Sequence, residues 1–272
     1  MAEFIFKGKK MYYEDHGEGF PLLMVNGIFM SCSSWDAFVP TLSKNNRLLM
    51  LDLVDQGRSE KVDYEYTHDL QIELIKEFLD YLKIEKVNIF SISYGGEVSM
   101  KFAARYPEMV NRLILANTAP RTNPWLLDMG KAWEYAMESC DGHQFFKTCI
   151  PVVYSPEFYT KNADWAHKRE EVFVKNFTPE DYAAFGRLIR SSETHDAREE
   201  LCKITAPTLI ISSEWDFITP LPDQDYLVRN IKTVLGHIML KNVGHASMYE
   251  YPEQLAAIIL GFLATDIGIK IL

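Results

Sequence analysis

The sequence predicts an α/β protein with a mostly parallel central sheet, flanked by helices and interrupted by a helical insertion. Apolar strand-like segments alternate with helical ones over residues 1–120, the alternation stops over 121–200, and it resumes over 201–272. Strands that alternate with helices indicate βαβ units and a parallel sheet. We therefore expect one core built from 1–120 and 201–272, with 121–200 as the insertion.

The beginning of the chain is typical of short strands separated by turns. Apolar runs and turn signals predict strands at 3–7, 10–15, 21–25 and 47–53, and helical spacing of apolar residues predicts a helix at 34–43. The first two strands are close enough in sequence to form a hairpin. The third ends at an Asn-Gly pair, where we expect a loop.

Helix and strand signals then alternate regularly. An amphipathic helix begins at Thr67, and it is followed by a strand at 87–92, a helix at 97–106 and a strand at 112–117. The second of these helices ends before a proline, which disfavours helical backbone in the residue before it. This order matches successive βαβ units.

The segment 121–200 differs from the rest in being rich in aromatic residues and poor in strands. Helical spacing recurs in it, and prolines divide it into several helices. Strand signals return at 208–212 and 237–242, and an amphipathic helix is expected at 252–263. We therefore interpret 121–200 as a helical cap over the core.

A serine stands where the strand at 87–92 meets the following helix. The local pattern is Ser91-Ile92-Ser93-Tyr94-Gly95, close to the G-x-S-x-G of a nucleophile elbow. A serine hydroxyl becomes a useful nucleophile when it is exposed, next to a base and near hydrogen-bond donors. A sharp strand-to-helix turn supplies the exposure and one donor, the N–H of Tyr94. The alternative is a glycine-rich turn that only packs a helix on the sheet.

A base and an orienting acid follow the two returning strands. Asp216 comes after the strand at 208–212, and His245 comes after the strand at 237–242. Loops after the C-terminal ends of parallel strands lie at one edge of a sheet, where ligand sites form. Ser93, Asp216 and His245 are therefore expected together, in the chain order of α/β-hydrolases.

The chain resembles the α/β-hydrolase superfamily, in its small cap-bearing esterase and lactonase branch. The matching segments are VNGI at 25–28, DLVDQGRS at 52–59, the turn at Ser93, RLILANTA at 112–119, and the loops with Asp216 and His245. The segment from 112 to 119 is also similar to 3-oxoadipate enol-lactonases. The resemblance covers nearly the whole chain except 121–200, which carries no matching motif.

The resemblance implies a serine nucleophile, Ser93, with His245 as base and Asp216 as orienting acid. It places a second oxyanion-hole N–H at Ile28, beside that of Tyr94. Three positions depart from the family pattern: Asn26 replaces His, while Asp55 and Ser91 each replace Gly. We expect Asn26 to hold its loop through the backbone and a small side chain at 91 to be tolerated.

Other residues offer competing interpretations. Glu214 is a second acid near Asp216, and Asp52 and Arg58 are expected to fix a loop. Trp125 and Trp133 are candidates for substrate binding, although aromatic residues in this segment more often form the core of the cap. The remaining histidines are mostly interpreted as solvated or capping residues; they are His16, His68, His143, His167, His195 and His237.

Composition excludes some partners. The formal net charge of −10 disfavours nucleic acid and anionic membranes. Four scattered cysteines include no C-x-x-C pair, so we expect neither a zinc site nor another metal, and free thiols in a cytoplasmic protein. No secretory signal is visible, and the longest apolar run is too short to span a bilayer. No cofactor is expected, and the sequence carries no signal for an oligomeric state.

The function predicted from these residues is hydrolysis of a small-to-medium carboxylic ester or lactone through an acyl-enzyme on Ser93. The partner is then a small-molecule acyl substrate. An acyltransferase or thioesterase using the same three residues is the alternative, because sequence cannot separate them. A non-catalytic receptor of the same fold is disfavoured by the presence of Ser93, Asp216 and His245 together.

Overall fold

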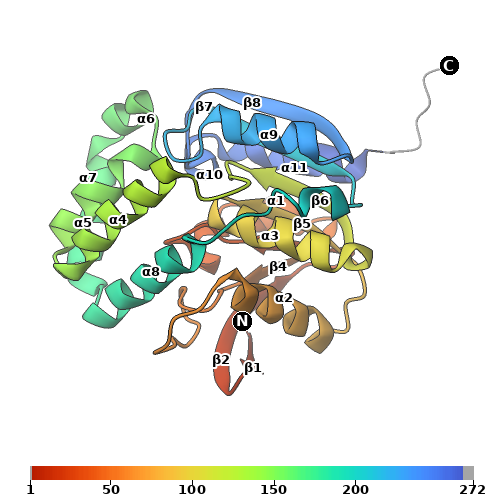
Figure 1. Ribbon diagram of the computed structural model, residues 1–272, viewed down its shortest axis with the longest axis horizontal. Helices are drawn as coiled ribbons and strands as arrows, with labels where there is room; N and C mark the ends of the chain where they lie inside the picture. Colours follow the sequence, from red (N-terminus) through yellow and green to blue (C-terminus); the bar gives the residue numbers. More distant parts are fainter. Residues whose placement is uncertain (1, 266–272) are drawn as a thin grey trace.

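The computed structural model describes residues 2–265 and contains an eight-stranded, mostly parallel sheet (Figure 1). The strand order is β1-β2-β4-β3-β5-β6-β7-β8. The pairs β1–β2 and β2–β4 are antiparallel, and all following pairs from β4 to β8 are parallel. The strands are β1 Ala2–Phe6, β2 Lys9–His16, β3 Phe20–Val25, β4 Asn46–Leu51, β5 Val87–Ile92, β6 Val110–Ala116, β7 Thr208–Trp215 and β8 Val234–Gly244. The α/β-hydrolase fold predicted from the sequence is thereby confirmed.

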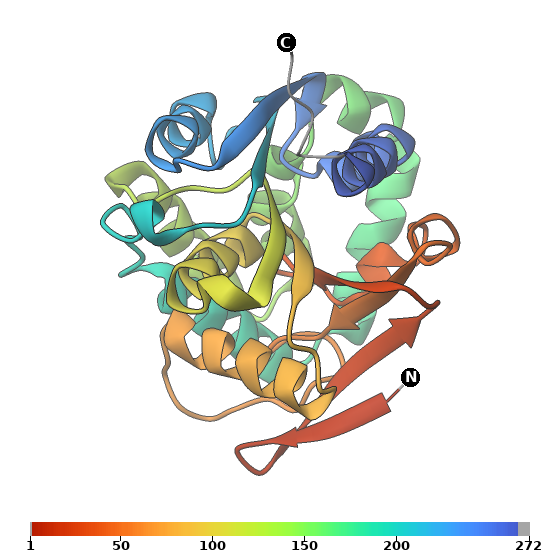
Figure 2. The same cartoon turned by 90° about the vertical axis from the view of Figure 1, so that its right-hand side faces the viewer.

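Helices cover both faces of the sheet, as Figure 2 shows. Helices α2 (His68–Tyr81), α3 (Tyr94–Arg105) and α9 (Leu221–Asn230) lie on one face, and α1 (Val39–Leu42) and α11 (Pro252–Ala264) lie on the other. All six residues of β5 are buried between these layers. The sequence of a strand that is covered on both faces is a continuous apolar run, which explains why β5 was predicted with its observed bounds.

Five helices lie between β6 and β7, to the left of the sheet in Figure 1. They are α4 Pro124–Glu138, α5 Gly142–Cys149, α6 Pro156–Lys161, α7 Ala163–Asn176 and α8 Pro179–Ser192. The chain enters and leaves this layer at one place, because Thr122 N–H donates to His195 O at 2.9 Å and Ala197 N–H donates to Pro120 O at 2.9 Å. We propose 121–200 as the bounds of this cap, with that junction as support. The ends of the predicted core ranges, residues 1 and 266–272, lie outside the described residues.

A buried ion pair joins the cap to the core. The guanidinium of Arg187 in α8 donates to both carboxylate oxygens of Asp55, at 2.8 and 2.9 Å, and the Asp55 side chain is fully buried. Asp55 has a φ of +68°, a conformation that usually favours glycine. Asp55, which stands where the family pattern has glycine, therefore supplies the ion-pair partner of Arg187 in the cap.

Two predicted helices differ from the structure. The segment 34–43 holds the end of a 3-10 turn, Cys32–Trp35, followed by the single-turn helix α1, because Pro40 has no N–H to continue a helix from the preceding turn. The helix predicted at 97–106 begins earlier, at Tyr94, directly after Ser93. The glycines at 95 and 96, which disfavour helix interiors, here lie in its first turn.

Short elements complete the fold. They are the 3-10 turns Pro107–Met109, Pro151–Val153 and Leu201–Lys203 and the single-turn helix α10, Ser247–Glu250. The four cysteines have free thiols, and among residues 2–265 the helices include none long and apolar enough to cross a membrane.

The first prediction concerns Gly95, where α3 meets the end of β3. A Cβ on Gly95 would lie 2.4 Å from Val25 O and 2.6 Å from Asn26 O. Both are backbone atoms that cannot rotate away, so Gly95→Ala is expected to lower the free energy of unfolding by about 2 kcal/mol or more. Gly261→Ala is the matched control, because a Cβ there meets nothing within 4 Å and Ala favours helix. Urea unfolding measures both; equal effects would contradict this account of the turn.

Candidate active site

Ser93 lies in a strained turn between β5 and α3. Its φ of +54° and ψ of −125° are unusual for a residue with a side chain. Two hydrogen bonds hold the turn: Ser93 N–H donates to Ala116 O at 3.0 Å, and Thr118 Oγ1 donates to Ser93 O at 2.8 Å. Such strain costs about 1–3 kcal/mol and persists only where the surroundings enforce it. The result is a serine hydroxyl presented at the C-terminal edge of the sheet.

The structure brings Ser93, His245 and Asp216 into one hydrogen-bonded chain. His245 Nε2 lies 2.8 Å from Ser93 Oγ, and His245 Nδ1 lies 2.8 and 3.0 Å from the two oxygens of Asp216. Asp216 and His245 are buried. An Nδ1–H that donates to the carboxylate leaves the Nε2 lone pair facing the serine hydroxyl, which is the tautomer a general base needs.

The carboxylate of Asp216 is held in place by three further donors. Ile218 N–H and Thr219 N–H donate to its Oδ1, and Thr219 Oγ1 donates to its Oδ2, each at 2.9 Å. These bonds stabilise the negative charge that burial would otherwise disfavour. Glu214, the competing acid, is exposed and accepts from Asn242 N–H at 2.9 Å. Asp216 is therefore the acid that faces His245.

The loop carrying His245 is fixed by Asn117, a residue that sequence reasoning did not single out. Asn117 Nδ2 donates to His245 O at 2.7 Å and to Ser213 Oγ at 2.9 Å. Asn117 lies within the segment 112–119 that carries the family resemblance. The signal was therefore present, but only the structure shows that this amide orients the base.

Asn26 holds the loop after β3, where Ile28 lies. Its Nδ2 donates to Leu51 O at 2.9 Å, and its Oδ1 accepts from Trp35 Nε1 at 2.7 Å. Gln56 Nε2 donates to Gly27 O at 2.8 Å, which anchors the same loop from another side. The substitution of Asn for His thus preserves a tethered loop.

Ile28 and Tyr94 both line the cavity beside Ser93. Tyr94 is the first residue of α3, so the helix cannot satisfy its backbone N–H. Its side chain is buried, and its hydroxyl lies 2.8 Å from Ser191 Oγ at the end of α8. Both residues predicted to supply oxyanion donors therefore line the same cavity as Ser93, and the role of each is part of the proposal below.

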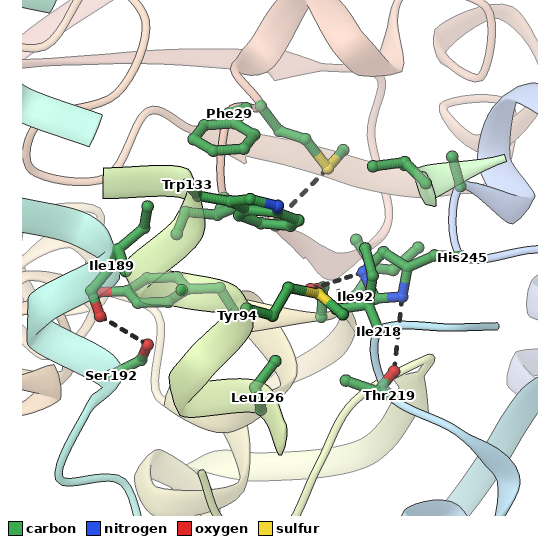
Figure 3. A pocket seen from close by; sticks show the side chains of 18 of the residues that line it. Phe29, Ile92, Tyr94, Leu126, Trp133, Ile189, Ser192, Ile218, Thr219 and His245 are labelled. Atoms are coloured by element: carbon green, nitrogen blue, oxygen red, sulfur yellow. Dashed lines mark hydrogen bonds between the residues drawn. The ribbon is translucent and has the colours of Figure 1, made fainter. Parts of the chain in front are cut away.

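The cavity over Ser93 lies between the core and the cap, and most of its lining is apolar. Trp133, Leu126 and Ile189 line it from the cap (Figure 3). Trp133, one of the two predicted substrate-binding residues, thus lines the cavity. Trp125, the other, does not: it is 60% exposed, and its indole N–H donates to Phe217 O at 3.3 Å. Substrate binding by either tryptophan stays a prediction, and the cavity favours Trp133 for this role.

One cation from the cap also lines the cavity. Arg169 in α7 has its guanidinium 5.0 Å from the ring centre of Trp165 and 4.8 Å from that of Tyr249. Ring faces hold a guanidinium by cation–π attraction and leave its N–H groups free to bind an anion.

Two histidines interpreted as solvated or capping are instead buried. His68 and His195 are only 2% and 3% exposed, and both lie near Glu97, which lines the cavity four residues after Ser93. Burial raises the pKa of Glu97 to about 7 and lowers the pKa of His68 to about 3. Scattered positions in the sequence gave no sign that these side chains meet.

Sheet topology and the Ser-His-Asp arrangement at the C-terminal edge of the strands are those of the α/β-hydrolase fold. The alpha/beta hydrolase fold family matches residues 21–252, and the chain belongs to this family of hydrolases. A 2-hydroxymuconate semialdehyde hydrolase from Pseudomonas sp. (strain CF600) is 26% identical, over 96% of this chain and 93% of its own. A 3-oxoadipate enol-lactonase from Acinetobacter baylyi is 24% identical, over 94% of each chain.

Solved structures of similar proteins have the same fold. An alpha/beta hydrolase enzyme from a Medee basin deep-sea metagenome library is 41% identical, with a TM-score of 0.96 over 99% of this chain and 100% of its own. The enol-lactonase from Burkholderia xenovorans LB400 is 22% identical, with a TM-score of 0.83 over 97% of this chain and 100% of its own. The latter similarity shows the fold alone.

The second prediction separates the two acids. Asp216→Asn replaces the acceptor of His245 Nδ1–H with an amide that favours the wrong tautomer, so turnover of an activated ester is expected to fall by about 10⁴-fold. Glu214→Gln is the control and should stay near the wild type, because Glu214 is exposed and accepts from the backbone N–H of Asn242, whereas His245 Nδ1 pairs with Asp216. Steady-state kinetics of both variants decide the assignment; a larger loss in Glu214→Gln would move the acid to Glu214.

Proposed function

We propose that this protein is a serine hydrolase that cleaves a small-to-medium carboxylic ester or lactone through an acyl-enzyme on Ser93. The observation that carries the proposal is the hydrogen-bonded chain from Asp216 through His245 to Ser93, which opens into the cavity under the cap. Within that chain every neighbouring pair lies at hydrogen-bond distance, so no rearrangement is needed to activate the serine.

In the first half of the reaction, Ser93 Oγ attacks the acyl carbon while His245 Nε2 takes its proton. The ester or lactone C–O bond then breaks, and His245 returns the proton to the departing oxygen. Asp216 keeps its negative charge throughout and stabilises the imidazolium. The N–H groups of Tyr94 and Ile28 would stabilise the oxyanion, and loss of one such donor typically costs about 2.7–4 kcal/mol.

In the second half, water attacks the acyl-enzyme with His245 again as base, and Ser93 is released. An alcohol or a thiol in place of water would give acyl transfer by the same steps, and a thioester would serve as an acyl donor. Hydrolysis is preferred here because relatives named as hydrolases and as an enol-lactonase span over nine-tenths of this chain.

The cavity indicates what kind of molecule reacts. Its apolar lining favours an apolar body, and Arg169 favours an anionic group some distance from Ser93. A carboxylate bound by a guanidinium makes two charge-assisted hydrogen bonds in one plane. We therefore propose a substrate that combines an apolar segment with a carboxylate, a chemistry shared with the 3-oxoadipate named for one relative.

The third prediction tests the reaction. The protein should hydrolyse members of a panel of p-nitrophenyl esters, lactones and acyl thioesters, and Ser93→Ala should lose at least about 10⁴-fold in kcat. Added alcohols or amines reveal acyl transfer as new products. Equal turnover in the wild type and Ser93→Ala would overturn the mechanism, and no turnover by the wild type of any ester, lactone or thioester would overturn the substrate class.

The fourth prediction tests Arg169. Arg169→Gln should raise KM about 10-fold for an ester carrying a free carboxylate and leave KM for its neutral amide analogue unchanged, because only the former loses a charge-assisted contact. Lys168→Gln is the matched control, since Lys168 is exposed and does not line the cavity. A similar rise in KM for both substrates would show that Arg169 shapes the cavity without recognising charge.

A further inference from the structure

Three buried side chains converge behind the nucleophile, and the proposed hydrolysis uses none of them. His68 begins α2, Glu97 lies in α3 one turn after Ser93, and His195 follows α8 where the chain leaves the cap. One ligand-type atom from each of the three lies within 4.8 Å of the others. All three residues are less than 5% exposed. The cluster therefore joins two core helices to the end of the cap.

The atoms that face one another lack hydrogen-bond partners. Among the described residues, the buried atoms left without one include His68 Nε2, Glu97 Oε2 and His195 Nδ1, one from each member of the cluster. His68 Nε2 and Glu97 Oε2 approach to 3.2 Å, but their geometry is not that of a hydrogen bond. Buried polar atoms are nearly always satisfied, so three unsatisfied atoms at one point indicate a missing partner.

The protonation of His195 is fixed by a backbone carbonyl. Its Nε2 lies 3.0 Å from Ala119 O, which can only accept, so the proton of the neutral ring is on Nε2. The lone pair is then on Nδ1, the buried nitrogen that has no hydrogen-bond partner. A ring that donates one N–H to a carbonyl and offers the other nitrogen is the usual arrangement of a metal-binding histidine.

The donor atoms of the cluster suit a cation. Two imidazole nitrogens and one carboxylate oxygen are available, and a carboxylate with imidazoles is a common ligand combination for divalent metal ions. Two charged groups also lie near His68, namely Lys101 and Asp69.

An ion can reach the cluster from outside. A surface depression, lined in part by Thr67 and Lys101, extends to His68 and His195. The active-site cavity is lined in part by Glu97. The surface depression therefore offers a path for an ion to the two histidines and a place for water as a further ligand.

We propose that His68, Glu97 and His195 bind a divalent transition-metal ion, Zn²⁺ above all, which fastens the end of the cap to the nucleophile helix. Two imidazoles and one carboxylate form a ligand set typical of Zn²⁺. Ligands in a tetrahedral zinc site are roughly 3.3 Å apart, so the 3.2 Å between His68 Nε2 and Glu97 Oε2 already fits, and His195, within 4.8 Å, needs to move inward by at most about 1.5 Å. The cysteine spacing led to the expectation of no metal site. The ligands proposed here are two histidines and a glutamate that are far apart in the sequence and form no local motif.

The test is a binding measurement on the full chain, purified without a polyhistidine tag and stripped with EDTA. Calorimetric titration with Zn²⁺ should give one ion per chain, and Co²⁺ should give the visible absorption of a tetrahedral nitrogen and oxygen site. At free Zn²⁺ about 100 times Kd, the unfolding midpoint should rise by roughly 5 °C. No binding by the folded wild type would overturn the proposal.

Variants locate the ion. Glu97→Gln and His195→Gln keep side-chain volume near the original but remove a ligand, so each should weaken Zn²⁺ binding by more than about 100-fold. His143→Gln is the matched control: His143 pairs with Glu170 at 3.0 Å at an exposed place, and binding should not change. Circular dichroism checks that each variant folds. Zn²⁺ binding that survives in folded Glu97→Gln and His195→Gln, or that is lost in His143→Gln, would place the ion elsewhere.

Discussion

The backbone turn at Ser93 is the constraint on which the site depends. Its φ of +54° is maintained because α3 starts against the end of β3, where Gly95 lies too close to Val25 O for any side chain. The serine backbone is held further because Ser93 N–H donates to Ala116 O in β6 and Thr118 Oγ1 donates to Ser93 O. The strain therefore resides in the packing of a helix between parallel strands, and the exposed hydroxyl follows from it.

Contacts between cap and core meet around the same turn. The hydroxyl of Tyr94, next to the nucleophile, reaches Ser191 at the end of α8, and Arg187 in α8 pairs with the buried Asp55. Near the base, Glu250 accepts from Ser155 N–H at 2.8 Å and from Gly244 N–H at 3.0 Å. A change in the cap is thus felt at both the nucleophile and the base, which links the shape of the cavity to the geometry of the reaction.

Much of the core could be predicted because its strands are buried on both faces and are separated by clear turn signals, as β5 shows. The three residues Ser93, Asp216 and His245 could be predicted because each follows a strand of one parallel sheet. The arrangement of the cap could not be predicted, since helical spacing shows which residues are apolar but not which of them face the cavity. The sequence therefore gave no reason to prefer Trp133 over Trp125. The pairing of Asp55 with Arg187 joins positions 132 apart, and no local pattern encodes it.

The most direct test of the central claim is covalent labelling with a fluorophosphonate, read by mass spectrometry of the intact chain and of its peptides. This account predicts one adduct per chain, on the peptide that contains Ser93, and no adduct in folded Ser93→Ala. Labelling that survives in Ser93→Ala, or a folded wild type that takes no label, would contradict the assignment of Ser93 as an activated nucleophile.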